Sequence, residues 1–178
     1  MMKGVVIYYS YSGNTKKVVD ILVRHINQQG EVDVIELKGL DESDKFFGQV
    51  LRALQHKRAA VQPVNFDLSG YDLICLGSPV WAFAPVPAMN TYLDKCTGVE
   101  NKDIILFTTY GSGTGNQRCL NYMQGTLAKK GARRFRKFSI QQFKVNDKEF
   151  VLSKIKGITR LSFGCAQDTA VTTDYMRL

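Results

Sequence analysis

The feature that most constrains the fold is an abrupt change of pattern near the N-terminus. Residues 5–9 are a continuous apolar run, and the polar loop of residues 10–15 follows directly. Beyond the loop, apolar residues recur at spacings of three and four, which predicts an amphipathic helix over residues 14–28 that ends at Gly30. A short apolar strand that leads through a loop into a helix is typical of a parallel sheet covered by helices.

The loop itself has the composition of a phosphate-binding loop. Gly13 can adopt a positive φ, and the N–H groups at the start of the following helix favour an anion. Neither the Gly-Lys-Ser/Thr of a Walker loop nor the three glycines of a dinucleotide fingerprint is present. The sequence therefore predicts a single phosphate here, and a plain helix cap without a ligand is the alternative. The donors that we expect are Ser10, Ser12, Asn14 and Thr15.

Strands and helices alternate along the rest of the chain. Apolar runs predict strands over residues 31–37, 73–76, 104–108 and 133–140, and the cations in the last favour an edge strand. Helical spacing predicts helices over residues 43–58, from Val86 to before Gly98, around Leu120–Leu127 and around residues 150–158. The pattern predicts an α/β fold, a three-layer doubly wound sandwich with a five-stranded parallel sheet, in one domain over residues 1–161. Residues 162–178 show no period and are predicted to be an extension or tail.

Composition limits the classes of function. No apolar run approaches the ~20 residues of a membrane span, which together with the absence of a signal-peptide pattern predicts a cytoplasmic protein. Cys75, Cys96, Cys119 and Cys165 are far apart, so we expect free thiols and no metal site. The net charge of +8, concentrated partly in residues 129–137, favours anionic partners over a specific nucleic-acid site.

Two further loops follow the predicted third and fourth strands, at the sheet edge where such folds bind ligands. Residues 77–87 place the only tryptophan, Trp81, and Phe83 in a proline-rich loop that we expect to be exposed. Residues 108–116 contain three glycines, Gly111, Gly113 and Gly115, which allow a close approach of the backbone to a ligand. A flat aromatic ligand would cover the exposed rings of the first of these loops, and the alternative is that Trp81 packs on a neighbouring helix.

The three loops together resemble those of the flavodoxin-like family, over about residues 3–160. The resemblance implies the strand order 2-1-3-4-5 and FMN as cofactor. Ser10, Ser12, Gly13, Asn14 and Thr15 would bind its phosphate. The residues that would flank its isoalloxazine ring are Ser78, Pro79, Val80, Trp81, Ala82 and Phe83, with Tyr110, Gly111, Ser112 and Gly113 at its pyrimidine edge or second face.

The resemblance leaves three functions open. The first is a redox flavoprotein that passes two electrons from NAD(P)H to a quinone or similar acceptor. The second is a one-electron carrier between proteins, and the third is a binding module without enzymatic activity. Electron-carrying flavodoxins have a glycine in the loop after the third strand, whose peptide can flip, whereas Val80–Phe83 contains none. The sequence therefore favours two-electron chemistry, with no side chain as the reacting group.

Overall fold

The computed structural model describes residues 1–39, 61–111 and 113–159. Five parallel strands form its sheet in the order β2-β1-β3-β5-β6, and a short strand, β4, pairs antiparallel with β3. Counted without β4, this is the predicted order 2-1-3-4-5. The bounds of the strands are Met2–Tyr8 for β1, Gly30–Glu36 for β2, Leu73–Trp81 for β3, Ala84–Pro85 for β4, Asp103–Tyr110 for β5 and Arg134–Gln141 for β6.

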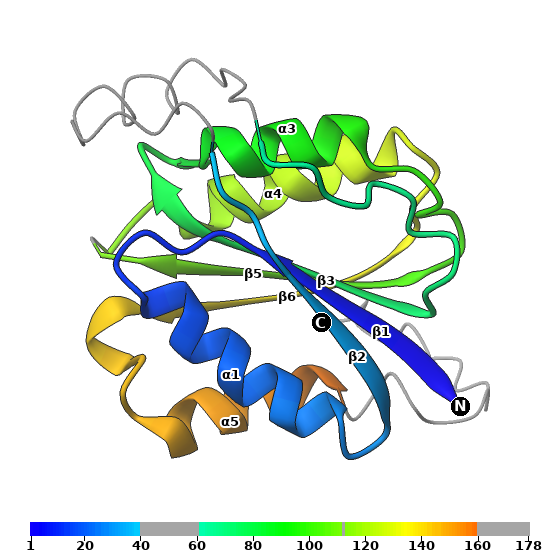
Figure 1. The fold of residues 1–178 in the computed structure, drawn as a ribbon. Coiled ribbons are helices and arrows are strands. Elements are labelled where there is room, and N and C mark those ends of the chain that lie inside the picture. The colour runs from blue at the N-terminus through cyan, green and yellow to red at the C-terminus, as the bar shows by residue number, and fades with distance from the viewer. Residues whose placement is uncertain (40–60, 112, 160–178) are drawn as a thin grey trace, which may run out of the picture.

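Helices cover both faces of the sheet (Figure 1). Helices α1 (Asn14–Ile26) and α5 (Lys148–Thr159) lie side by side on one face, and α3 (Pro87–Lys95) and α4 (Asn116–Ala128) lie on the other. A 3₁₀ turn, η1 (Gln142–Lys144), joins β6 to α5. Because the central strands are buried on both faces, two apolar clusters flank the sheet, as expected for a parallel sheet between helix layers. The predicted three-layer sandwich is confirmed.

The predicted boundaries needed three corrections. Gly30 does not end a helix: α1 ends at Ile26, and Gly30 begins β2, where a Cβ would lie 2.2 Å from the carbonyl oxygen of Met2. The strands β3 and β5 extend to Trp81 and Tyr110, beyond their apolar centres. Pairing with the neighbouring strand continues through polar residues here, since Ser78 and Thr108 are register partners. Much of what the sequence suggested to be loop is therefore strand.

Several predictions lie outside the described residues. These are the helix over residues 43–58, Ser112, Cys165 and the extension over residues 162–178. Of the four cysteines, Cys75, Cys96 and Cys119 are free and buried. Burial raises the pKa of the Cys96 thiol to about 11 and raises the pKa of the other two as well, so these thiols belong to the core.

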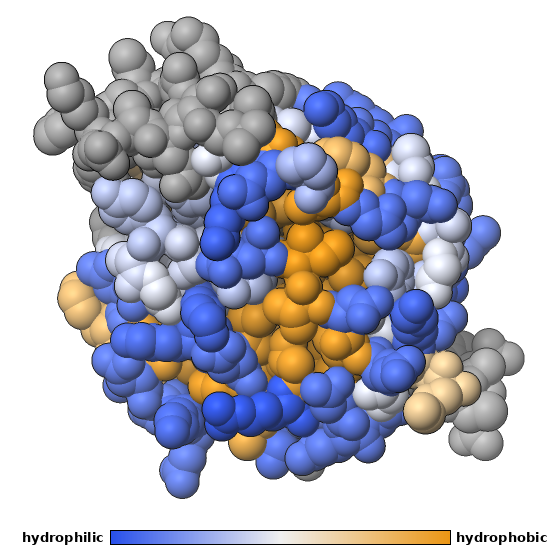
Figure 2. Space-filling model, viewed as in Figure 1, coloured by the Kyte–Doolittle hydropathy of each residue, from blue (hydrophilic) through white to orange (hydrophobic). Residues whose placement is uncertain are grey.

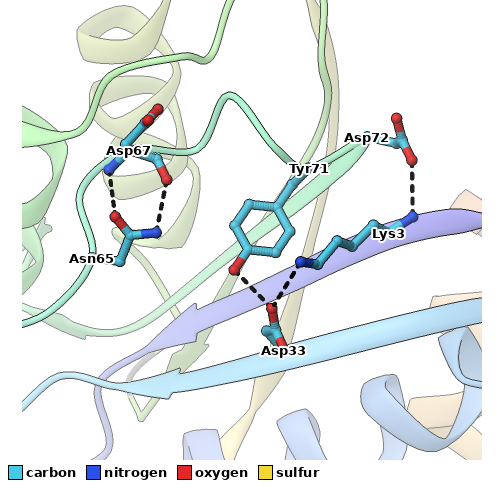
Figure 3. A network of polar contacts seen from close by, with 6 residues as sticks. All are labelled: Lys3, Asp33, Asn65, Asp67, Tyr71 and Asp72. Atoms are coloured by element: carbon cyan, nitrogen blue, oxygen red, sulfur yellow. Dashed lines mark hydrogen bonds and ion pairs between the residues drawn. The ribbon is translucent and has the colours of Figure 1, made fainter.

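A polar network joins the start of β1, the middle of β2 and the residues just before β3 (Figure 3). The Tyr71 hydroxyl donates to the Asp33 carboxylate at 2.8 Å, and the Lys3 ammonium lies 3.9 Å from the same carboxylate. The Lys3 backbone N–H donates to Asp72 at 2.8 Å. The network fixes β1 against β2 and the start of β3. It does not involve the carboxyl edge of the sheet, where ligands of such folds bind. No helix in the described parts of the chain is long and apolar enough to cross a membrane.

Candidate functional site

A hollow of about 410 Å³ lies at the carboxyl ends of β1, β3 and β5. Its volume is within the range of small-molecule sites in proteins. The loop before α1, the end of β3, the end of β5 and the turn after β6 all contribute to it. Its lining residues are Tyr11, Ser12, Asn14, Thr15, Pro79, Val80, Trp81, Thr109, Tyr110, Gly111 and Gln142.

The loop between β1 and α1 is preorganised to receive an anion. Gly13 caps the helix with φ 80°, the left-handed conformation that glycine adopts without strain. The Ser10 hydroxyl accepts the backbone N–H of Lys16 at 3.2 Å, which fixes the loop against the helix. The backbone N–H groups of Asn14 and Thr15 lie in the first turn of α1, where no helical carbonyl is available to them. They add donors and the positive end of a helix dipole to one end of the hollow.

A buried hydroxyl pair connects this loop to the end of β5. The hydroxyls of Thr15 and Thr109 are 2.9 Å apart, and the two side chains are 1% and 3% exposed. Each residue also lines the hollow. Among the described residues, those that line the hollow are all uncharged. Neutral donors and a helix N-terminus would therefore bind the anion here, without a cationic side chain.

Trp81 forms an aromatic wall of the hollow, but it is not the exposed loop residue that the sequence suggested. It is the last residue of β3, only 7% exposed, and belongs to the apolar cluster on the α3 and α4 side. The rings of Tyr9 and Tyr11 contact it edge to face, with centroids 5.9 and 5.6 Å away. Tyr11 lines the hollow and is 51% exposed, so it presents more aromatic surface to solvent there than Trp81 does. Core packing thus positions the tryptophan before any ligand binds.

The segment after Trp81 is a two-residue β-hairpin, which corrects the expectation of a long proline-rich loop. Ala82 and Phe83 have φ 47° and 67°, both in the left-handed region, as in a type I′ turn between β3 and β4. Neither residue lines the hollow, and Phe83 is 45% exposed. The Phe83 ring lies against the N-terminus of α4, where a Cβ at Gly115 would approach it to 2.5 Å. Left-handed non-glycine residues cost about 1–2 kcal/mol each, so the hairpin holds strain beside the site.

Ser78 lies behind the wall of the hollow. It is fully buried, and its hydroxyl donates to the Pro79 carbonyl at 2.9 Å and accepts the Val86 N–H at 3.2 Å. Both bonds are local, so Ser78 holds the hairpin against the start of α3. Gly113 lies outside the lining as well, and a Cβ there would meet nothing within 4 Å.

The structure brings most of the predicted site residues together and adds three. The predicted residues that line the hollow are Ser12, Asn14, Thr15, Pro79, Val80, Trp81, Tyr110 and Gly111. Ser10, Gly13, Ser78, Ala82, Phe83 and Gly113 do not line it, and Ser112 is outside the described residues. Tyr11, Thr109 and Gln142 also line the hollow, although they were not predicted from the sequence. The Gln142 side-chain amide lies against Gly111, with its nitrogen 3.2 Å from the position of a Cβ there.

The sequence matches the NADPH-dependent FMN reductase family over residues 2–144. The chain belongs to this family. No curated protein matches the sequence. A flavoprotein from Lactobacillus acidophilus NCFM, crystallised with FMN, is 22% identical, covers 84% of this chain and 99% of its own, and superposes with a TM-score of 0.61.

Other solved structures share the fold of this FMN reductase family member. An NADH:FMN oxidoreductase in its apo form is 16% identical over 93% of this chain and 92% of its own, with a TM-score of 0.62. An oxidised flavodoxin from Bacillus cereus is 18% identical over 90% of this chain and 99% of its own, with a TM-score of 0.58. The flavodoxin-like fold and FMN as the cofactor are thus established, and the chain is an FMN-binding redox flavoprotein.

The hollow is suited to FMN in its chemistry as well as its size. The backbone N–H groups at the start of α1 and the Ser12 hydroxyl can bind a phosphate, and Trp81 and Tyr110 border a space for a flat ring. The described lining is neutral throughout, so its donors at this end are hydroxyl and amide groups. The described residues therefore hold both kinds of surface that a phosphorylated flavin needs.

Proposed function

We propose that this protein is an oxidoreductase that takes two electrons from NAD(P)H and passes them, through bound FMN, to a quinone or similar flat acceptor. The observation that carries the proposal is the hollow itself. It joins the N-terminus of α1 to an aromatic wall, and its described lining contains no carboxylate, histidine, lysine or cysteine side chain. When bound, FMN supplies the redox chemistry, and the protein's part is to bind and orient it.

In this proposal the first loop binds the phosphate. Ser12 and Asn14 donate from their side chains, and Asn14 and Thr15 donate from the backbone. Trp81 and Val80 cover one side of the ring, and Tyr110 and Gly111 border the ring from β5. Tyr11, half exposed beside Trp81, offers an aromatic surface to a flat acceptor that enters from solvent.

The hairpin supports the choice of two-electron over one-electron transfer. Rotation of the Ala82–Phe83 peptide would convert a type I′ turn into a type II′ turn, whose first central position favours glycine. Alanine occupies that position here, so the peptide resists the flip that the resemblance associates with one-electron carriers. Ala82→Gly removes this resistance and is the matched variant for the test.

Steady-state oxidation of NADH and NADPH by the FMN-loaded protein, with a water-soluble quinone as acceptor, tests the proposal. We expect turnover that depends on NAD(P)H, on the quinone and on FMN. When the protein is titrated with a reductant, we expect both electrons to enter in one step. In Ala82→Gly the two electrons should enter in more widely separated steps. Wild-type protein that does not oxidise NAD(P)H and that accepts electrons in two well-separated steps would be a one-electron carrier instead.

A further inference from the structure

A second concave surface lies between α1 and α5, away from the aromatic wall of the FMN site. Two adjoining hollows of about 260 and 210 Å³ share Ile21, Arg24 and Lys148 and so form one groove, the α1–α5 groove. The helices lie side by side at the lower part of Figure 1, and the same part of the surface is mostly hydrophilic in Figure 2. The complete lining is Lys17, Asp20, Ile21, Arg24, His25, Gln28, Val145, Asn146, Lys148, Leu152 and Lys156.

Three cations of the groove have no partner among the described residues. Arg24, Lys148 and Lys156 are exposed and form no hydrogen bond or ion pair with any described residue. Asp20 is the one carboxylate in the described lining, and the Lys16 ammonium already holds it at 2.9 Å. Unpaired cations that converge on one concavity are a binding surface for anions.

The protonation of His25 is consistent with positive charge around the groove. Its Nε2 lies 2.8 Å from the Thr159 hydroxyl, which itself donates to the Ile155 carbonyl at 3.0 Å, so Nε2 carries the proton and donates to Thr159. Burial and the positive charge of Lys156 lower the pKa of His25. The ring therefore belongs to the wall of the groove, and the exposed lysines and arginine supply its charge.

The longest basic run of the sequence, residues 129–137, is different, because most of its cations are bound locally. The Lys130 ammonium donates to the carbonyls of Asp94 and Cys96, and Lys137 donates to Asn121. Arg134 pairs with Asp103 at 2.9 Å. These cations fix β6 and the end of α4 to their neighbours. Lys129 and Arg133 are exposed as well, but neither lines the groove. The cations that converge on the groove are therefore the better candidates for a partner.

The groove is also amphipathic. Ile21 and Leu152 are half-buried within its lining, next to the cations. From Lys17 to His25 the α1 side of the groove extends for about 12 Å, the length of about four extended residues or two helical turns. A small inorganic anion would leave the apolar side chains uncovered, and a nucleic acid would find no exposed aromatic ring in this lining on which to stack.

We propose that the α1–α5 groove binds an acidic amphipathic segment of a partner protein. Carboxylates of the segment lie against Arg24, Lys148 and Lys156, and its apolar side chains cover Ile21 and Leu152. The surface is separate from the aromatic wall of the hollow, so a partner docks there without covering that side of the FMN site. The proposal does not depend on which electron donor or acceptor the flavin uses.

Fluorescence anisotropy of a short labelled peptide made of alternating pairs of glutamate and leucine tests this on the full-length, FMN-loaded protein. We expect binding that weakens steeply when salt rises from about 0.05 to about 0.5 M. The double variant Arg24→Glu/Lys148→Glu should weaken it about tenfold or more. The matched control is Lys129→Glu/Arg133→Glu, which reverses one lysine and one arginine, both exposed, at the other helix layer and should bind as wild type.

Each alternative gives its own result. Equal weakening in both double variants would mean a general effect of net charge and overturn the proposal. Equally tight binding of a peptide in which serine replaces leucine would overturn the proposal that the partner segment is amphipathic. Failure of the peptide to bind, or binding of a single-stranded oligonucleotide that only Arg24→Glu/Lys148→Glu abolishes, would overturn it as well. Unchanged FMN affinity in the variants shows that they are folded.

Discussion

Ser12 is the single side chain whose role in FMN binding can be isolated most cleanly. It lines the hollow on the loop before α1, and its described contacts include no bond that the fold needs. Loss of a hydrogen bond to a charged group costs about 1.5–3 kcal/mol. We therefore expect Ser12→Ala to lower the affinity of the apo-protein for FMN by about tenfold to a hundredfold, measured by titration. Riboflavin, which lacks the phosphate, is the control, and its affinity should not change. Wild-type protein that binds FMN and riboflavin equally would refute the phosphate site.

Trp81 can report on the position of the flavin ring because it is the only tryptophan of the chain. It already lies in the wall of the hollow, edge to face with Tyr9 and Tyr11. Addition of FMN to the apo-protein should quench its fluorescence strongly, with the change saturating at the same FMN concentration as flavin binding. An emission spectrum that does not change at saturation would place the ring away from this wall.

At the scale of elements, strain in the β3–β4 hairpin should be detectable in the free energy of unfolding of hairpin variants. Ala82 is left-handed, whereas Ala84 is extended in β4 and 2% exposed. Ala82→Gly relieves the strain of a left-handed alanine, which stabilises the folded state, but it also raises the conformational entropy of the unfolded chain. The free energy of unfolding should therefore stay the same or rise by up to about 1 kcal/mol. Ala84→Gly should lower it by about 1 kcal/mol, because no strain is relieved and a buried methyl is lost. Urea unfolding of both apo-variants measures the contrast. A loss in Ala82→Gly as large as that in Ala84→Gly would show that the turn is not strained.

The elements also show how far the sequence could predict this fold. Apolar runs predicted the central strands, because burial on both faces requires such runs. The order of the strands did not follow from these runs and came from the resemblance of the three loops to the flavodoxin-like family. The ends of β3 and β5 were not predictable in this way. Ser78 and Thr108 continue the ladder through backbone pairing, which hydrophobicity does not reveal. Likewise, Gly30 looked like a helix end but is needed for the close approach of β2 to Met2.

The candidate site followed the same pattern. Residues in loops with an unusual composition, such as Ser12 and Trp81, were predicted, and Gln142 was missed because the sequence after β6 has no such composition. One signal was available: the carboxyl ends of all parallel strands meet at one edge of a sheet, so the residue after Gln141 had to be close to the other loops. The left-handed hairpin could not be predicted, since Ala-Phe is not a sequence that such turns favour.

At the scale of the whole molecule, buried tyrosines link stability to alkaline pH. Tyr8, at the end of β1, is 3% exposed, and burial, followed by the charge of Glu36, raises its pKa to about 12 from an ordinary value of 10.0. A hydroxyl with a raised pKa in the folded state contributes stability that is complete below the unfolded pKa and is lost as pH rises through the folded pKa.

We therefore expect the free energy of unfolding to fall between about pH 10 and 12, as Tyr8 ionises in the unfolded chain only. In Tyr8→Phe the fall should be smaller by about 1–2 kcal/mol over this interval. Glu36→Gln is a graded control: it removes the second cause of the shift and leaves burial, so its fall should lie between those of the wild type and Tyr8→Phe. Urea midpoints measured at intervals across this pH range test the order of the three proteins.

The Tyr71 hydroxyl donates to Asp33 and has a raised pKa for that reason. It therefore adds a loss of stability of the same sign, which Tyr8→Phe does not remove. A wild-type profile as flat as that of Tyr8→Phe would mean that the end of β1 opens to solvent before the rest of the fold.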